Sequence, residues 1–442
     1  MRLRIQRLGE LPGLLRTPVG RQELVQELAL RSWPAIAPLV RGYRTAILRG
    51  TPVVVVVGSQ GKSTTARALC AALELPLRRW LDLNAGAEIA LNLFTSSPLR
   101  RALVLEVGIG APGQMADYAR HLTPTHVVVT SIGTEHHSSL GPKEDIRAEK
   151  ARMVERVPRG GTVFLNADDE HVLWMRSRTA AECVTFGFSE LADVRAVELR
   201  TDFPRGIAFT LHAGGRRYET RTRFVSRDLL RAFLAAVAVA ARLGENVETV
   251  LERLEALAPA SRRLEPRRLA NGAWLLRDEY KSSLETIDSA FDVLESLDAR
   301  RFVVLGEVSE PPGSQGPVYG RLGERLAGFA HTAVFVGGNF ERYRAGALRA
   351  GMERGRLVNA GRSWRAAAER LRGTLGEGDV VLVKGRDTQR LDRVSLSLLG
   401  YDVRCERTEC VLPDCERCSL LSVPSQASTA NRSSARGSST SE

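Results

Sequence analysis

The sequence predicts an α/β protein in which a doubly wound, mostly parallel sheet carrying a glycine-rich loop is followed by a smaller Rossmann-like α/β domain. Five consecutive valines, Val53–Val57, have the length and β-branching of a strand buried on both faces. Apolar strand-like runs then alternate with helical stretches as far as about Ser261. A fresh alternation begins near Arg268, which indicates a second unit of the same class.

The glycine-rich loop follows the valine strand directly and leads into an Ala- and Leu-rich helix. Backbone N–H groups and the helix dipole at such a junction form a cradle for phosphate, and Lys62 adds a full positive charge. The Ser63 hydroxyl stands where the Mg²⁺ of bound ATP would be held. The commoner spacing would place a further glycine at Val56, so a plain glycine turn with a solvated lysine is the alternative interpretation. The residues predicted to bind the nucleotide are Gly58, Ser59, Gln60, Gly61, Lys62, Ser63 and Thr64.

Length and composition describe an ordinary globular protein of two or three domains. The chain has 442 residues, 43% hydrophobic and 26% charged. It contains no run of about twenty apolar residues, and the start MRLRIQRLGE lacks the apolar centre of a signal peptide. We therefore expect no membrane span and a cytoplasmic location. The net charge of +12 is not concentrated in basic runs with interleaved aromatic residues, so no nucleic-acid partner is expected.

Composition and the positions of helix-breaking and turn-forming residues divide the chain into five segments. Residues 1–50 predict two amphipathic helical stretches broken by prolines 12, 18, 34 and 38. Residues 51–263 form the predicted nucleotide-binding domain, in which 193–225 break the alternation as antiparallel strands joined by turns. Residues 264–404 form the second domain, 405–420 a cysteine-rich segment, and 421–442 a Ser/Thr-rich tail expected to be disordered.

Apolar runs bounded by turn residues locate the strands. In the first domain we expect them at 53–57, 102–107, 126–131, 162–166 and 183–186, and in the second at 273–276, 302–305, 333–336 and 380–383. Helices are expected at 227–243, ended by Gly244, and at 247–257.

The cysteine-rich segment holds four of the six cysteines. Cys405, Cys410, Cys415 and Cys418 are spaced as four, four and two intervening residues, and the last pair has a common zinc spacing. A structural Zn²⁺ site is predicted, an iron–sulfur cluster would use the same thiolates, and four unligated cysteines are the remaining alternative.

Several stretches in order resemble the Mur ligase family, ATP-dependent enzymes that join an amino acid or peptide to a carboxylate. The similarity spans about Pro52 to Gly400 and is strongest to the members that add D-alanyl-D-alanine. The short glycine spacing of the loop is the form found in that family. The resembling stretches are 58–65, LNAGAEIALNL (83–93), LEVG (105–108), TSIGTEHHSSLGPKEDIRAEK (130–150), LNADD (165–169), SRRLEP (261–266), RDEYKSSLETI (277–287), LGE (305–307) and VKGRD (383–387).

The resemblance implies a Mg²⁺ site and assigns its ligands. Glu106 closes an apolar strand and matches a metal-binding glutamate. His136, fourteen residues before Lys150, matches the family histidine better than His137 does. Lys150 matches a lysine that is carbamylated, and it could coordinate Mg²⁺ only in that form. Ser63 completes the implied metal ligands.

The resemblance also assigns roles in binding and transfer. Lys62, Lys150 and Arg263 are the implied catalytic residues, with Arg263 reaching the transferred phosphate. Asn166 would contact the nucleotide base, Asp278 and Tyr280 would lie near the amine and nucleotide, and Lys384 and Arg386 could meet phosphates or a carboxylate. A substrate carboxylate would attack the γ-phosphate of ATP, and an amine would then displace phosphate to form an amide.

Three departures leave the substrate open. The separate N-terminal domain that holds the UDP end of the substrate has no counterpart in residues 1–50, the helix at 226–229 lacks a His-Asn pair, and Lys281-Ser282-Ser283-Leu284 replaces the Asn-Ala-Asn-Pro of the dipeptide-adding members. The expected partners are a small-molecule or peptidoglycan-precursor carboxylate and an amino acid or dipeptide. A lipid-linked or poly-amino-acid substrate, a nucleotide-binding regulator without ligation, and a metal-cluster nucleic-acid ATPase are the alternatives. The oligomeric state stays open.

Overall fold

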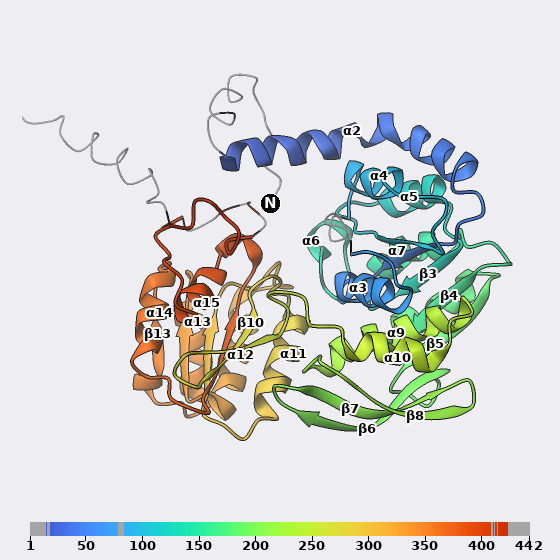
Figure 1. Ribbon diagram of the computed structural model, residues 1–442. Coiled ribbons are helices and arrows are strands. Elements are labelled where there is room, and N and C mark those ends of the chain that lie inside the picture. The colour runs from blue at the N-terminus through green and yellow to red at the C-terminus, as the bar shows by residue number, and fades with distance from the viewer. Residues whose placement is uncertain are drawn as a thin grey trace, which may run out of the picture.

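The protein consists of two α/β units, each built on its own sheet (Figure 1). The computed structural model describes residues 15, 18–77, 84–407, 410, 412 and 414–422. The predicted disordered tail from residue 423 onward lies outside the described residues. No helix in the described part of the chain is long and apolar enough to cross a membrane.

The first sheet has eight strands in the order β2-β1-β3-β4-β5-β6-β7-β8. Neighbours from β2 through to β6 pair in parallel, whereas β6, β7 and β8 form an antiparallel ribbon, as the sequence predicts. The strands are β1 (Val53–Val57), β2 (Leu103–Glu106), β3 (His126–Val129), β4 (Thr162–Asn166), β5 (Glu182–Gly187), β6 (Val194–Asp202), β7 (Gly206–Ala213) and β8 (Arg216–Thr222).

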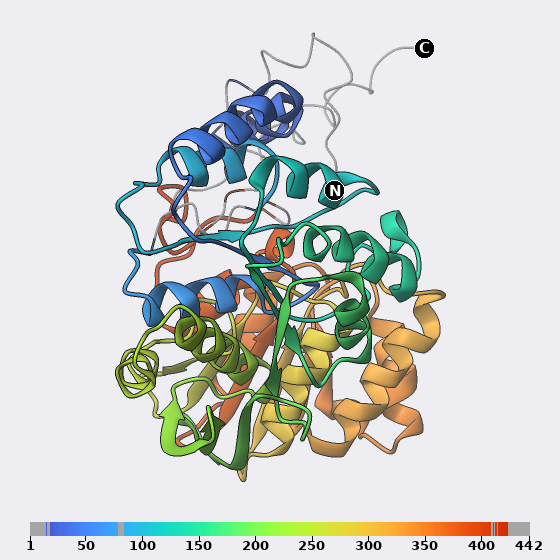
Figure 2. The same ribbon diagram turned by 90° about the vertical axis from the view of Figure 1, so that its right-hand side faces the viewer.

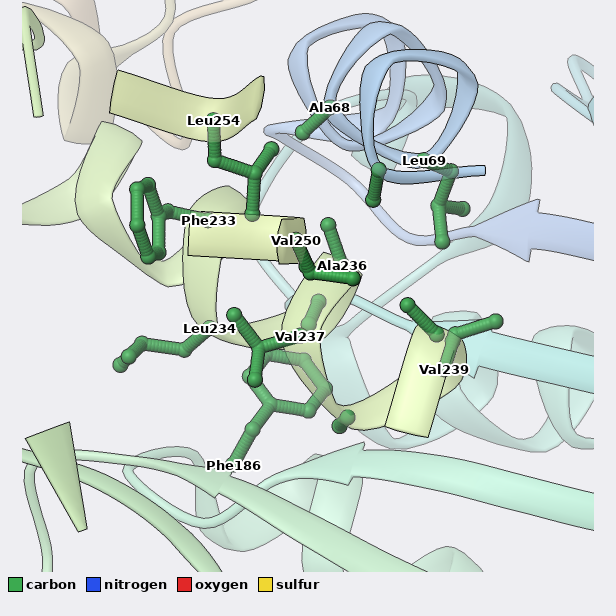
Figure 3. Packing of buried hydrophobic residues seen from close by; sticks show 14 of the residues in the cluster. Ala68, Leu69, Phe186, Phe233, Leu234, Ala236, Val237, Val239, Val250 and Leu254 are labelled. Atoms are coloured by element: carbon green, nitrogen blue, oxygen red, sulfur yellow. The ribbon is translucent and has the colours of Figure 1, made fainter. Parts of the chain in front are cut away.

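Helices cover both faces of this sheet because its central strands are apolar on both sides. One face packs against α3 (Lys62–Ala72), α9 (Arg227–Arg242) and α10 (Val247–Glu255). Figure 3 shows Leu69 of α3, Val237 of α9 and Val250 of α10 among the side chains of this layer. The other face packs against α4 (Ala87–Phe94), α5 (Gln114–Leu122) and α7 (Lys143–Val154). The short helices α6 (His137–Leu140) and α8 (Glu170–Leu173) and the 3₁₀ turn η2 (Trp174–Arg178) complete the unit.

A single 29-residue helix, α2 (Pro18–Ala46), lies outside α4 and α5 (Figures 1 and 2). The prediction of two stretches broken at Pro34 and Pro38 is wrong, because both prolines lie within the helix. A proline inside a helix costs about 3 kcal/mol through a lost hydrogen bond and a steric clash. Both rings are exposed, so water can solvate the freed carbonyls, while Trp33, Ala37 and Val40 on the opposite side are buried against the first unit.

The second sheet has six strands in the order β13-β12-β11-β14-β10-β9, all parallel except the pair β9–β10. Two of these strands, β9 and β13, are short and were not expected from the sequence. The strands are β9 (Glu265–Arg268), β10 (Trp274–Asp278), β11 (Arg301–Leu305), β12 (Thr332–Phe335), β13 (Leu357–Asn359) and β14 (Val380–Lys384). The helices are α11 (Leu284–Glu295), α12 (Gln315–Phe329), α13 (Phe340–Arg349), α14 (Trp364–Arg372) and α15 (Asp392–Leu398), with 3₁₀ turns η3 (Arg354–Arg356) and η4 (Asp387–Gln389).

The four C-terminal cysteines do not form the predicted metal site. Among the described residues, which include all four, no three His, Cys, Asp or Glu side chains are placed to hold a metal ion. The segment spreads the cysteines over different packing environments. The Cys405 carbonyl accepts a hydrogen bond from Trp364 Nε1 at 3.1 Å, whereas the Cys415 side chain belongs to the apolar core beside Val394 and Leu421. Burial raises the pKa of the Cys415 thiol to about 12.

Candidate active site

A cavity of about 580 Å³ lies at the carboxyl ends of the central strands of the first sheet and extends to the second unit. Open parallel sheets place their ligand crevice at this edge. The cavity lining includes most residues that the sequence singled out, namely Ser59, Gln60, Gly61, Lys62, Ser63, Thr64, Glu106, Asn166, Arg263, Asp278 and Tyr280. His136, Lys150 and Gly58 are not part of this lining.

The loop between β1 and α3 needs both of its glycines. Gly58 has φ 149° and Gly61 has φ 78°, a region that favours glycine. A Cβ at Gly58 would overlap the Thr130 hydroxyl, which follows the neighbouring strand β3. The Lys62 ammonium donates to the carbonyl oxygens of Gly58 and Ser59 at 2.9 and 3.0 Å. Lys62 is thus folded back over the loop, above the place where a phosphate would lie.

Glu106, the last residue of β2, is a buried carboxylate with an unused oxygen. It is 3% exposed, and its Oε1 accepts a hydrogen bond from Asn84 Nδ2 at 2.7 Å. Its Oε2 has no hydrogen-bond partner within the described residues. Burial raises the pKa of the Glu106 carboxyl above its ordinary value, and the Lys62 charge opposes this only in part. A buried oxygen of this kind is suited to a cation. Asn84 was not singled out individually, although it lies in a stretch that resembles the family.

Lys150 lies in α7, directly behind the loop. Its ammonium donates to Ser59 Oγ at 3.0 Å, and the residue is 3% exposed. Burial, followed by the positive charge of Lys62, holds the pKa of the Lys150 amine well below its ordinary value. The neutral form of the amine is therefore populated at a lower pH here than in water.

The segment after β3 places a glutamate in the cavity beside the predicted histidine. His136 has φ 64°, and its side chain is 36% exposed, 3.9 Å from Glu135 and 3.9 Å from Glu310. Glu135 lines the cavity instead and lies 3.7 Å from Lys62 Nζ and 2.5 Å from Lys281 Nζ. Burial alone would raise the pKa of Glu135, but Lys281 and Lys62 outweigh it and hold that pKa well below its usual range. The sequence analysis missed Glu135, and its position beside His136 was the available signal.

The second unit closes over the loop through α11. Glu285, in the first turn of α11, accepts from Gln60 Nε2 at 3.0 Å and from the Thr134 N–H at 2.7 Å. Gln60 Nε2 also donates to Ser283 Oγ at 3.3 Å. Gln60, predicted only as part of the loop, therefore joins the two units.

The segment between the two units delivers Arg263 to the loop. Arg263 Nη2 donates to Ser63 Oγ at 3.0 Å, and its guanidinium lies 4.3 Å from the centre of the Tyr280 ring. The residues on either side, Arg262 and Leu264, have φ values of 63° and 48°. Non-glycine residues rarely adopt this conformation, and it fixes the direction of the segment at Arg263.

Asp278 and Lys384 form a buried pair at the ends of β10 and β14. Lys384 Nζ lies 2.7 Å from Asp278 Oδ2 and also donates to the Lys281 carbonyl, and Lys384 is fully buried. Burial lowers the pKa of Lys384. Lys384 is therefore engaged with the chain itself and does not line the cavity, whereas its partner Asp278 does. Arg386 is likewise absent from the lining.

Asn166 and Asp168, at the end of β4, hold neighbouring segments together. Asn166 donates to the Thr130 carbonyl at 2.9 Å and accepts from the Asp168 N–H at 3.0 Å. Asp168 accepts from Arg231 Nε of α9 at 2.8 Å, and Arg231 and Arg227 each lie 4.9 Å from the Phe188 ring. These arginines, with Asp228, occupy the start of α9 where the sequence lacks the His-Asn pair.

The comparisons with known proteins agree with this geometry. Residues 56–240 match the Mur ligase middle domain, and residues 262–386 match the glutamate ligase domain of Mur ligases. A phosphate loop, a buried carboxylate and an arginine that meet at one crevice between these two domains are the parts of an ATP-dependent ligase. The chain belongs to the Mur ligase family.

Within that family the chain is similar to MurF, the UDP-N-acetylmuramoyl-tripeptide–D-alanyl-D-alanine ligase. It is 28% identical to the Mycobacterium tuberculosis enzyme over 377 residues, which are 80% of this chain and 74% of that protein. It is 23% identical to the Bacillus subtilis enzyme over 376 residues, 83% of this chain and 79% of that protein. The crystal structure of MurF from Acinetobacter baumannii shares the fold, with a TM-score of 0.74, 22% identity, and coverage of 83% of this chain and 80% of that one. MurF from Thermotoga maritima in complex with ADP has a TM-score of 0.72 at 20% identity, covering 83% of each chain.

Proposed function

We propose that this protein is an ATP-dependent ligase that forms an amide bond between a substrate carboxylate and the amine of an amino acid or peptide, in the synthesis of a peptidoglycan precursor. One observation carries the proposal: Lys62, Glu106 and Arg263 come from three distant parts of the sequence and line a single cavity. The similarity to MurF enzymes over four-fifths of the chain supports the reaction class.

ATP would bind with its phosphates on the loop Gly58–Thr64. Mg²⁺ commonly uses one or two carboxylates together with the phosphates of the substrate and water. Ser63 and the unused Oε2 of Glu106 fit that requirement. Bound there, Mg²⁺ would neutralise charge on the phosphates. His136 and Lys150 are proposed as further ligands, Lys150 as its carbamate. The neutral amine that burial favours at Lys150 is the form that attacks CO₂, losing a proton as the N–C bond forms.

The reaction would then follow in two transfers. A carboxylate oxygen of the first substrate attacks the γ-phosphorus, the bond to the β,γ-bridging oxygen breaks, and ADP leaves. Arg263, 3.0 Å from Ser63 Oγ, is placed to stabilise charge on the transferred phosphoryl oxygens. The amine of the second substrate attacks the acyl carbon, phosphate leaves with its bonding electrons, and the nitrogen loses a proton. The protein contributes mainly by positioning and by charge neutralisation.

The identity of the substrates is proposed from the relatives and from the cavity. A UDP-linked muramoyl peptide and D-alanyl-D-alanine are the substrates in the names of the similar enzymes. Lys281 replaces the first asparagine of the family's Asn-Ala-Asn-Pro and pairs with Glu135 at 2.5 Å inside the crevice. This pair favours a different carboxylate or amine as the second candidate, either lipid-linked or a poly-amino acid. Because ATP is supplied in the cytoplasm, we propose that location for the enzyme.

The test is phosphate release by the full-length protein with ATP and Mg²⁺, using a panel of carboxylates and amines. We expect release only when a suitable carboxylate and amine are both present, and we expect Lys62→Ala to abolish it. If no pair of substrates stimulates release, whereas a polynucleotide does, the ligase proposal is wrong.

A further inference from the structure

A second cavity, of about 680 Å³, lies at the opposite edge of the first sheet from the crevice. Its walls come from the end of α2, the end of α5 with the loop that enters β3, and the turn that follows α7. These segments precede β1, β3 and β4, so the cavity lies at the amino ends of the strands. Five arginines line it: Arg41, Arg44, Arg49, Arg120 and Arg156. We call this the arginine pocket. Among the residues that the structure describes, no Asp or Glu contributes to its lining.

None of these five arginines forms an ion pair with any residue in the described ranges. This sets them apart from their neighbours on the same surface. Arg152, one turn before Arg156, lies 3.1 Å from Glu155, and Arg178 lies 2.6 Å from the same glutamate. Five cationic groups around one cavity repel one another unless an anion joins them.

Arg44 is the most informative of the five because it is buried. It is 5% exposed, and one terminal nitrogen donates to the Leu48 carbonyl at the end of the same segment. Its Nε has no hydrogen-bond partner in the part of the chain that the structure describes. A buried N–H donor that lacks an acceptor costs more free energy when it belongs to a charged group than when it belongs to a neutral group. An acceptor in the pocket would remove that cost.

We propose that the arginine pocket binds a phosphate-bearing anion. The planar guanidinium fork matches phosphate oxygens with two parallel hydrogen bonds, and several such forks around one cavity suit a doubly charged or larger anion. The phosphate can come from a phospholipid headgroup or from a free diphosphate. Leu39 and Ile47 of the same segment are 65% and 49% exposed and could enter the outer layer of a membrane beside a headgroup. The proposal does not depend on the ligase reaction, since the crevice lies at the other edge of the sheet.

Calorimetric titration of the full-length protein with pyrophosphate tests the site itself. The phosphate loop also binds pyrophosphate, so the titration is made in the Lys62→Ala background, which disables the crevice. We expect one remaining site, weakened about ten-fold or more by Arg41→Gln together with Arg120→Gln. Both of these side chains are exposed, so folding should survive their replacement. Arg152→Gln removes one charge from α7 outside the pocket and should leave the affinity unchanged.

Vesicle sedimentation separates the two sources of phosphate. Full-length protein is mixed with phosphatidylcholine vesicles that contain or lack phosphatidylglycerol. Sedimentation with the anionic vesicles only, lost in the Arg41→Gln/Arg120→Gln variant, assigns the pocket to a lipid headgroup. Pyrophosphate binding without sedimentation assigns it to a free anion. The proposal is overturned if neither probe binds, or if the double variant binds as tightly as Arg152→Gln. Melting temperatures measured without anion test whether the arginines have a purely structural role. In that case the double variant would melt at a lower temperature and bind the anion with unchanged affinity.

Discussion

The two edges of the first sheet both collect cationic side chains, but they balance them differently. At the carboxyl edge, Lys62 and Lys281 both face the single carboxylate of Glu135, at 3.7 and 2.5 Å, and Arg263 donates to Ser63. At the amino edge, five arginines line a cavity, and no carboxylate of the described residues lines it with them. The first edge is neutralised from within the chain, and the second is not.

This difference bears on what each edge requires from a ligand. A nucleotide at the carboxyl edge meets a Lys62 ammonium that already donates two of its three N–H groups to the carbonyls of Gly58 and Ser59. The charge of Lys62 is therefore shared with the chain before a nucleotide arrives. At the amino edge the charges are already free, so an anion gains the full attraction on arrival. Five positive charges of this protein, whose net charge is +12, thus lie at the edge of the sheet opposite the crevice.

The largest effect at the carboxyl edge is expected for Arg263→Ala. Loss of the arginine proposed to stabilise the transferred phosphoryl group should lower kcat for phosphate release about 10³-fold. The kcat of Arg263→Lys should lie between those of the wild type and Arg263→Ala. Lysine keeps the positive charge but loses the planar guanidinium fork and the contact with Tyr280. Steady-state phosphate release measures both variants. An alanine variant within ten-fold of the wild type would remove Arg263 from the reaction, and pyrophosphate binding in the arginine pocket should not change.

Glu106→Gln should lower kcat roughly 10²-fold, because it removes the charge proposed to face Mg²⁺. Its melting temperature should be unchanged or higher, since burial raises the pKa of Glu106 and the charged form is costly in the folded protein. Phosphate release against Mg²⁺ concentration and a thermal melt give the two results. Glu369→Gln, at an exposed position of α14, is the matched control. A stable variant with normal activity would show that Glu106 is not a metal ligand.

Trp33→Ala should disturb the packing at the amino edge of the first sheet and leave the crevice intact. Trp33 is 6% exposed, donates to Asp117 at 2.6 Å and contacts the Tyr118 ring at 4.9 Å, so its removal should destabilise the packing of α2 by about 3 kcal/mol. Urea unfolding measures the loss, and Leu39→Ala, at an exposed position, should cost less than about 0.5 kcal/mol. Anion binding in the arginine pocket should weaken, with kcat retained. Equal losses of anion binding in the arginine pocket and of kcat in the crevice would show that α2 also supports the crevice.

The smallest effect is expected from the Glu135–Lys281 pair. The Lys281 side chain is 48% exposed, so solvent screens the pair, and a double-mutant cycle with Glu135→Gln and Lys281→Met should give a coupling of about 1 kcal/mol in kcat/KM for the amine. The pKa of Glu135 is held below its usual range, so its stabilising contribution is present above the ordinary value of 4.5 and is lost only as the pH falls well below it. The coupling should therefore be constant from pH 6 to 8. A coupling that changes across that interval would contradict the assignment.

The sequence predicted those parts of the site that depend on local pattern. The valine strand, the loop glycines and Lys62 are adjacent, and strand–loop–helix geometry follows from them. Glu106 was found because it closes an apolar strand. The Glu135–Lys281 pair was not predicted, because it depends on a contact between residues 146 positions apart.

The remaining errors have the same origin in tertiary contacts. Pro34 and Pro38 predicted breaks, but burial of Trp33 and Val40 keeps one helix. The cysteine spacing predicted a metal, yet in the described part of the chain no three metal-binding side chains gather there. The arginine pocket could not be predicted, because its lining comes from three segments that are separate in the sequence, namely 41–49, 119–125 and 156–158.

The left-handed backbone at Arg262 and Leu264 has an evolutionary and practical consequence. Their side chains hold the segment in place, since Leu264 is 4% exposed in the core of the second unit and Arg262 lies 3.6 Å from the buried Asp392. A glycine at either position would relieve roughly 1 kcal/mol of backbone strain, but it would remove the buried packing or the ion pair, which costs more. Screens that select this enzyme for thermostability should therefore retain Arg262 and Leu264, and with them the direction in which Arg263 points.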